Sequence, residues 1–281
     1  MTGMAVLRHR GARAVVRLRG AHISSFVVVL DEGPREALMV APWAPADGQA
    51  LLPGSSTEWH RTYSGGWHPL IPRPLGPAEV DGIDQPYHGE AAWIDWRLSA
   101  RSRRRCELTV ALRTVPLRIT RRVELTAGCR GARLALRTVV SNYGVDPALF
   151  GWGEHPTLSA GLFDGGVVTV GSESRAVTDA GGKDFFVAET GVRDARVTGS
   201  RTSAHLTWRG ASSSHVYVWQ ERGATRGFPW YGRADALAIE PASQAPDLER
   251  TALGPLRLGP GESMEATMSL RIGPTSQLLT G

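Results

Sequence analysis

The sequence lacks the features that mark several common classes of protein. It has two cysteines in 281 residues, and Lys183 is the only lysine among its 32 cationic residues. No apolar run approaches the roughly 18 residues of a membrane-spanning helix. The first 19 residues carry scattered cations and no continuous apolar stretch of the kind found in a signal peptide. We therefore expect a cytoplasmic protein with no membrane contact and no disulfide framework.

Motifs for metals, nucleotides and serine nucleophiles are also missing. The eight histidines are widely separated, and no HxH, HExxH or CxxC pattern occurs. There is no P-loop and no glycine-rich GxGxxG turn after a predicted strand, and no GxSxG elbow. We expect neither a metal ion nor a cofactor.

The charge of the chain does not predict a nucleic-acid interface. The net charge is +5, but the arginines are spread along the chain among 27 acidic residues. The one dense run, Arg101 and 103–105, lies between two strand-like segments and is interpreted as a solvated hairpin turn. The near-absence of lysine is interpreted as a compositional bias.

Glycine, proline and the hydrophobic pattern predict an all-β protein. The chain has 33 Gly and 18 Pro, which would interrupt long helices, and 42% of its residues are hydrophobic. In segments such as 106–113 and 264–272, apolar residues occupy every second position, as in half-buried strands. Similar segments are 12–18, 22–30, 91–98, 117–125, 132–141, 203–209, 214–220 and 235–240. No helix longer than two turns is predicted. The expected fold is one domain, 1–281, built as a large antiparallel β-sandwich of two packed sheets.

Two of these strands carry candidate chemistry on the face opposite the core. In 235–240, Leu237 and Ile239 are expected to face the core, which leaves Glu240 on a face with small alanines that gives room for a ligand. In 214–220, Tyr217 and Trp219 share the outer face with His215, a surface on which a sugar ring can stack. Each segment also has a simpler interpretation. Glu240 can be an ordinary surface glutamate at a strand end, and the aromatic row of 214–220 can cover another loop or sheet.

Two further segments concentrate histidines beside glycine-rich turns. Trp152, Glu154 and His155 lie in the run Phe-Gly-Trp-Gly-Glu-His-Pro, and an imidazole there can act as a general acid. Residues 65–73, which end at Arg73, are followed by His88 in the run Tyr-His-Gly-Glu. Polar groups on rigid turns of this kind suit the hydroxyl groups of a sugar.

Taken in order, these motifs resemble the aldose 1-epimerase, or galactose mutarotase-like, family. The matching pieces are Gly-Gly-Trp-His-Pro-Leu-Ile-Pro from residue 65, Tyr-His-Gly-Glu-Ala from 87, Trp-Gly-Glu-His-Pro-Thr-Leu from 152, Pro-Trp-Tyr-Gly-Arg from 229 and Ala-Ile-Glu-Pro-Ala-Ser from 238. They extend over about residues 20 to 272. The resemblance implies a large β-supersandwich and an isomerase that interconverts the α and β anomers of an aldose without a cofactor.

The resemblance also implies roles for individual residues. His155 is expected to be the acid that protonates the ring oxygen, and Glu240 the base that takes the proton of the anomeric hydroxyl. The expected substrate-binding residues are His88, Arg73, Trp152, Trp219, Trp67 and Glu154. Typical members have Asn before the acidic histidine and an aromatic residue soon after its proline. Here Glu154 precedes His155, and Thr and Leu follow the proline, which places the chain in a divergent branch.

Two other functions are compatible with the same residues. A glycoside hydrolase using Glu154 and Glu240 requires both carboxylates to face one bond, about 5–5.5 Å apart for retention or 6.5–9.5 Å for inversion of configuration. A non-catalytic carbohydrate-binding sandwich requires only the aromatic platforms. The expected partner is a small sugar, and the expected assembly is a monomer or a homodimer. Of the remaining tryptophans, Trp230 is a candidate wall of the site, whereas Trp43, Trp59 and Trp96 have no assigned role.

Overall fold

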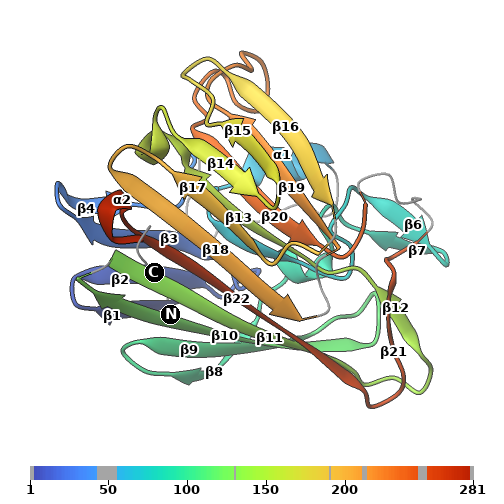
Figure 1. Cartoon of the computed structure of the whole chain (residues 1–281). Helices are drawn as coiled ribbons and strands as arrows, with labels where there is room; N and C mark the ends of the chain where they lie inside the picture. Colours follow the sequence, from blue (N-terminus) through green and yellow to red (C-terminus); the bar gives the residue numbers. More distant parts are fainter. Residues whose placement is uncertain are drawn as a thin grey trace.

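The structure, a computed structural model, describes residues 3–42, 56–129, 131–189, 191–210, 214–245 and 252–278, and most of its regular structure is β-strand. Two large antiparallel sheets dominate it (Figure 1). The first sheet contains, in spatial order, β1 (Met4–His9), β2 (Ala12–Arg17), β3 (Ile23–Leu30), β5 (Trp67–Leu70), β13 (Gly153–Ser159), β20 (Ala236–Ala242), β19 (His215–Glu221) and β16 (Lys183–Glu189), and β4 (Gly33–Glu36) pairs with β3.

The second sheet contains β15 (Glu173–Ala176), β14 (Val167–Val170), β17 (Asp194–Thr198), β18 (Thr202–Gly210), β22 (Ser263–Pro274), β11 (Gly131–Asn142), β10 (Leu117–Gly128), β9 (Arg105–Ala111) and β8 (Arg97–Arg101). Two small ribbons pair β12 (Ala148–Phe150) with β21 (Leu256–Leu258) and β6 (Ala78–Val80) with β7 (Ile83–Gln85). The helical elements are short: α1 (Ser56–Thr62), α2 (Thr275–Leu278), η1 (Glu90–Ala92) and η2 (Ala160–Phe163). The predicted all-β sandwich of two sheets is confirmed.

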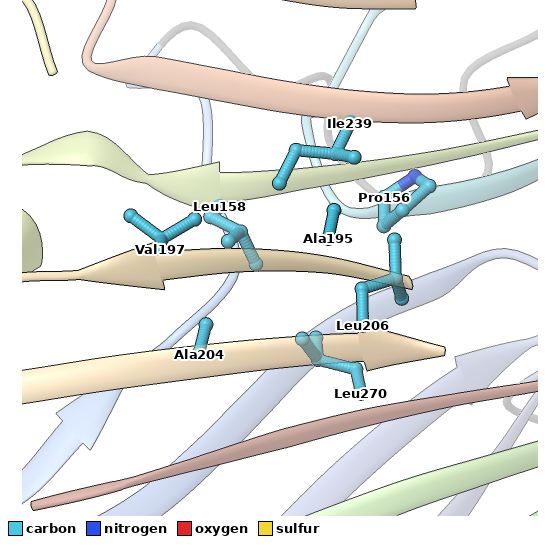
Figure 2. A pocket seen from close by; sticks show the side chains of 8 residues that line it. All are labelled: Pro156, Leu158, Ala195, Val197, Ala204, Leu206, Ile239 and Leu270. Carbon is cyan, nitrogen blue, oxygen red and sulfur yellow. The ribbon is translucent and has the colours of Figure 1, made fainter. Parts of the chain in front are cut away.

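The two sheets share one hydrophobic core. Alternate residues of the paired strands point into it, as the period of a β-strand requires. Figure 2 shows part of this layer, where Pro156, Leu158 and Ile239 of the first sheet meet Ala195, Val197, Ala204, Leu206 and Leu270 of the second. The gaps between these side chains are too narrow for a water molecule, so β13 and β20 rest on a closely packed support.

One ion pair is buried between the sheets. Arg121 of β10 donates from Nη1 to Glu154 Oε1 at 2.6 Å and from Nη2 to Oε2 at 2.8 Å. The indole Nε1 of Trp67 donates to the same Oε2 at 2.8 Å. Arg121 and Glu154 are almost completely buried. The carboxylate of β13 is therefore fixed to the opposite sheet by two charge-assisted hydrogen bonds from Arg121, and a third comes from Trp67 of the neighbouring strand β5 in its own sheet.

The segment 91–98 differs from its predicted strand. Residues Glu90–Ala92 form the 3-10 helix η1, and strand β8 begins only at Arg97. The Glu90 carboxylate accepts the backbone N–H groups of Arg113 and Thr114, at 2.9–3.0 Å. The indole Nε1 of Trp93 donates to the carbonyl of Tyr87 at 2.6 Å. These side chain to backbone bonds hold the segment as a turn, although its apolar residues fit the strand pattern.

Smaller features of the sequence have clear positions in the fold. The arginine run lies at an exposed hairpin between β8 and β9, as predicted. Cys106 is buried and Cys129 is exposed, and both are free thiols. Within the described ranges, no helix has the length and apolar character needed to cross a membrane.

Candidate functional site

A row of titratable side chains crosses the middle of the first sheet. His68 of β5 is the direct pairing partner of His155 of β13, and Tyr217 of β19 is the partner of Glu240 of β20. The β13–β20 register on both sides of His155 places it level with Glu240. Because residues level with one another on paired strands share a face, the four side chains lie in one line.

The strand pattern explains why this row faces away from the core. Leu237 and Ile239 on β20, and Val216 and Val218 on β19, belong to the core between the sheets. Their neighbours must point to the opposite face, and Trp219 does pack there, against a second apolar cluster. The predicted faces of both strands are confirmed.

His155 and Glu240 form the centre of the row. The distance between His155 Nε2 and Glu240 Oε1 is 3.3 Å. The other ring nitrogen, Nδ1, lies 3.0 Å from the hydroxyl of Thr157, which in turn lies 2.6 Å from the hydroxyl of Tyr63. Both ring nitrogens of His155 therefore have a polar partner, and these two contacts fix the orientation of the ring.

Burial shifts the pKa values of the central pair in opposite directions. Loss of hydration lowers the pKa of His155 to about 4 and raises the pKa of Glu240 to about 8. Between these values the pair holds one proton, and burial favours its position on Glu240. The acid role expected for His155 and the base role expected for Glu240 require the proton on His155 instead, so burial favours the opposite distribution of the same one proton. Burial also lowers the pKa values of His68 and His88 well below their usual range.

Aromatic side chains cover the row of titratable groups. The Trp59 ring of α1 has its centre 5.0 Å from that of His68 and 4.8 Å from that of His88. The ring centre of Tyr63, which follows α1, lies 5.8 Å from that of His155, and the ring centre of His88 lies 5.5 Å from it. The second apolar cluster consists of Met39, Ala41, Trp59, Tyr63, Ala92, Trp230, Ala234 and Ala236. We call these residues, with His88, His155 and Glu240, the aromatic site.

A left-handed turn brings His88 into the aromatic site. The φ angles of His88 and Gly89 are 64° and 78°. A Cβ atom at Gly89 would lie 2.5 Å from the backbone of Ile71, so this position accepts only glycine. The His88 Nδ1 atom lies 2.9 Å from the carbonyl oxygen of Pro74. The sequence His-Gly therefore encodes both the turn and the direction of the imidazole.

Three of the expected substrate-binding residues lie outside the aromatic site. Trp67 and Trp152 have no exposed surface and belong to the core between the sheets. Glu154 points to the same core and binds Arg121. The physical reason is strand alternation: Glu154 precedes His155 on β13, so the two side chains face opposite sides of the sheet. The glycoside hydrolase reading, which needs Glu154 and Glu240 on one face, is wrong for the same reason.

The remaining expected residues are at the margin of the site or inside it. His88 is a member of it. Trp219 is half-buried and its ring centre lies 5.4 Å from that of Trp230, which supports the predicted wall position of Trp230. Arg73 is buried, and its guanidinium donates to the carbonyls of Gly76 and Ala252. It therefore fixes loops next to His88.

Several residues of the site were missed at the level of sequence. Thr157 could have been found, because it stands two positions after His155 and so shares its face. Trp59 and Tyr63 carry no such signal, because α1 is shorter than the patterns that identify a helix and its contacts are all distant in sequence. Trp43 lies outside the described residues.

The described residues contain no group of three or more His, Cys, Asp or Glu side chains placed to hold a metal ion. The histidines of the aromatic site instead contact aromatic rings and backbone or side-chain oxygens. What the arrangement offers chemically is a buried acid–base pair with one proton, lined by aromatic surfaces.

Several solved structures share the fold. A galactose mutarotase-like protein from Lactobacillus casei is 16% identical, with a TM-score of 0.67, and the match covers 96% of this chain and 100% of that one. A galactose mutarotase related enzyme from Lactobacillus acidophilus is 15% identical, with a TM-score of 0.70 and coverage of 96% and 97%. An aldose epimerase homologue from Caenorhabditis elegans is 13% identical, with a TM-score of 0.60 and coverage of 97% and 99%. No protein-family model and no curated protein matches the sequence. The fold is thus that of the galactose mutarotase-like proteins.

Proposed function

We propose that the protein interconverts the α and β anomers of an aldose by acid–base ring opening at the aromatic site. The observation that carries the proposal is the separation of 3.3 Å between His155 Nε2 and Glu240 Oε1, in a buried row on the face opposite the core. The fold shared with galactose mutarotase-like proteins supports it.

The reaction needs one group that accepts a proton and one that donates a proton. Glu240 takes the proton of the anomeric hydroxyl while His155 gives a proton to the ring oxygen. The bond between C1 and the ring oxygen breaks, and the C1 carbonyl forms. Rotation about C1–C2 and closure with the proton roles reversed yields the other anomer, so the pair ends with the one proton with which it began.

In the sugar-free site the raised pKa of Glu240 favours the proton on the carboxyl group. Transfer of that proton to His155 across the pair gives the ionised base and the protonated acid that this assignment uses. The number of protons does not change, so the reaction requires no exchange with solvent.

The surroundings of the pair favour a small, uncharged sugar. Aromatic faces such as those of Trp59 and Trp230 suit the apolar face of a pyranose ring. Burial is the cause of the raised pKa of Glu240, whereas a guanidinium beside it would lower that pKa. Arg73, the cation expected here, donates to loop carbonyls.

The proposal is tested by measuring anomerisation of a panel of aldoses by polarimetry after subtracting the spontaneous rate. Glu240→Gln keeps the shape of the side chain but removes the base, and we expect the catalysed rate to fall by roughly 10²- to 10⁴-fold. Glu79→Gln, at an exposed carboxylate of β6, is the matched control and should leave the rate unchanged. An unchanged rate in Glu240→Gln would contradict the assignment.

The alternative of a non-catalytic carbohydrate-binding sandwich makes a different prediction for the same proteins. It predicts that calorimetry detects binding of an aldose to the wild-type chain while polarimetry detects no acceleration. The close pairing of Thr157, His155 and Glu240 favours catalysis, because stacking on aromatic rings alone requires no such chain of polar contacts.

A further inference from the structure

Two hairpin tips at one edge of the molecule are rich in arginine. The first is the turn between β1 and β2, and the second is the turn between β8 and β9. Together they carry Arg8, Arg10, Arg13, Arg101, Arg103 and Arg104, which we call the arginine tips. Arg105, which begins β9, is left out because its cross-strand neighbour is Glu124.

Backbone contacts hold the two tips together. The Arg8 N–H of the first tip donates to the Arg103 carbonyl of the second at 2.7 Å. The second tip is also held to β10, whose Leu125 N–H donates to the Arg104 carbonyl at 2.8 Å. The Ser102 hydroxyl accepts the Arg105 N–H at 3.1 Å and so closes the second turn. Between the tips lies a hollow of about 380 Å³, lined by Val6, Arg8, Arg101, Ser102 and Arg103. The hollow therefore has a backbone framework that is already formed.

The positive charge on the six arginines of the tips exceeds the net charge of the whole chain. The net charge is +5, so the chain without these six arginines has a net charge of −1. Neither 8–13 nor 101–104 contains an acidic residue. Arg8 and Arg13 are direct pairing partners on β1 and β2, an arrangement of like charges that disfavours the fold unless an anion compensates it.

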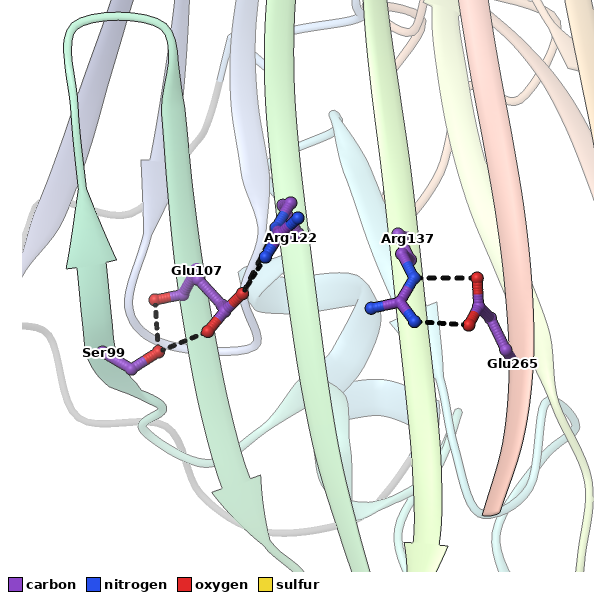
Figure 3. A network of polar contacts seen from close by, with 5 residues as sticks. All are labelled: Ser99, Glu107, Arg122, Arg137 and Glu265. Carbon is purple, nitrogen blue, oxygen red and sulfur yellow. Dashed lines mark hydrogen bonds and ion pairs between the residues drawn. The ribbon is translucent and has the colours of Figure 1, made fainter.

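Some arginines elsewhere on the second sheet, by contrast, have acidic partners. Figure 3 shows Arg122 bound to Glu107, at 3.0 Å from Nη2, and Arg137 bound to Glu265 through two hydrogen bonds of 2.6 and 2.8 Å. Among the described residues, none of the six arginines of the tips forms an ion pair within 4.0 Å. The positive charge at the tips is thus uncompensated within the described part of the chain.

The shape and chemistry of the hollow favour a small anion with several phosphate groups. A volume of about 380 Å³ lies within the range of small-molecule sites. Guanidinium groups bind phosphate oxygens through paired hydrogen bonds, and three arginines around one hollow can engage more than one phosphate. The tips carry no Trp, Tyr or Phe on which the bases of a single-stranded nucleic acid could stack, and the one imidazole there, His9, accepts the backbone N–H of Ala127 at 2.8 Å.

We propose that the arginine tips bind a small polyphosphate, at a site separate from the aromatic site. Figure 1 places β1, β8 and β9 away from α1 and β20, at the other side of the molecule. The strand order agrees, because β1 and β8 are edge strands of their sheets and β13 and β20 are central. The proposal does not depend on the sugar chemistry proposed above.

Isothermal titration of the full chain with inorganic tripolyphosphate at near-physiological salt tests the site. We expect saturable binding that weakens at least about tenfold in the double variant Arg8→Ser/Arg103→Ser. The matched control is Arg118→Ser/Arg257→Ser, which removes two exposed arginines outside the tips and lowers the net charge equally. The control should bind within about twofold of the wild type, because its phosphate contacts are intact.

Three results would overturn the proposal. The first is the absence of saturable binding to the wild type, and the second is equal weakening in both double variants, which reports only net charge. The third is that a single-stranded RNA oligonucleotide binds much more tightly, per phosphate, than tripolyphosphate does, and that the tip variant loses this binding. That result would assign the tips to nucleic acid. The tip variant should keep the anomerisation rate of the wild type and unfold at no lower temperature in the absence of polyphosphate, so failure of this site and failure of the sugar site are distinguishable.

Discussion

The imidazole of His155 is held at both of its nitrogens. Nε2 faces Glu240 at 3.3 Å, and Nδ1 faces the Thr157 hydroxyl at 3.0 Å. The Thr157 hydroxyl also contacts Tyr63, so its proton is directed by two neighbours. The partner of Nδ1 selects which tautomer presents Nε2 to the site. Thr157 is thus a positioning residue that acts through His155.

Thr157→Val removes this hydroxyl with little change of side-chain volume. We expect kcat for anomerisation to fall between about tenfold and a hundredfold, with a much smaller change in KM, because the orientation of the acid changes and the sugar-binding surfaces do not. The lower limb of the pH–rate profile should also move, because that limb reports the pKa of His155. Polarimetry across a pH series measures both effects.

Thr157→Ser is the control for this prediction, because it restores the hydroxyl without the methyl group. A positioning role requires the serine variant to recover most of kcat and the original pH profile. If the serine and valine variants lose the same activity, Thr157 acts only through packing.

At the scale of elements, β13 joins the core to the aromatic site. Its consecutive residues Glu154 and His155 point to opposite faces, one to Arg121 of the second sheet and the other to Glu240. The ion pair therefore fixes the strand that carries the acid. A buried charge of this kind is stabilised only while its partner is present.

Arg121→Met tests the ion pair. It leaves Glu154 buried with Trp67 and without its cation, and we expect the free energy of unfolding to fall by about 3–5 kcal/mol. The double variant Arg121→Met/Glu154→Gln removes both charges and keeps an acceptor for the Trp67 indole, so it should recover a large part of the loss. Urea unfolding of the wild type, both single variants and the double variant gives the coupling energy. Additive losses in this cycle would contradict a specific pair.

The sequence predicts the elements of the fold where local pattern decides the structure. Strict alternation correctly gave the core and outer faces of β19 and β20, because strand period alone sets those faces. It failed in 91–98, where the Glu90 carboxylate and the Trp93 indole bind backbone groups and impose a turn. Membership of a motif also did not show which face of the sheet a side chain occupies. Trp152 and Glu154 lie in the same motif as His155 but face the core.

The cover of the aromatic site could not be predicted at all. Trp59 contacts His68 and His88. Tyr63 contacts His155, although the two residues are 92 positions apart in the sequence. Contacts between a helix of about two turns and distant strands leave no periodic signal. The site residues on central strands could therefore be predicted from the sequence, whereas the residues that enclose them could be identified only from the three-dimensional structure.

At the scale of the whole molecule, the fold tolerates almost complete replacement of its sequence. Identities of 13–16% accompany TM-scores of 0.60–0.70 over nearly the entire chain. A two-sheet core requires apolar residues at alternate positions and does not require particular ones, so the pattern persists when identity does not. The expected assembly as a monomer or homodimer and the cytoplasmic location stay predictions.

The enclosure of Glu240 by the molecule also links its stability to pH. The pKa of Glu240 is raised from 4.5 to about 8 by burial, so over this interval the folded state keeps a proton that the unfolded state has released. The stabilisation from this group is complete below pH 4.5 and is lost as pH rises through 8. Glu240→Gln has no proton to lose. We therefore expect the variant to gain stability relative to the wild type as pH rises: the free energy of unfolding of Glu240→Gln minus that of the wild type should be larger at pH 9 than at pH 5 by a few kcal/mol. Urea unfolding at both pH values, with Glu79→Gln as the exposed control, measures the difference. A pH-independent difference between Glu240→Gln and the wild type would show that the carboxyl group ionises normally and is hydrated in the folded protein.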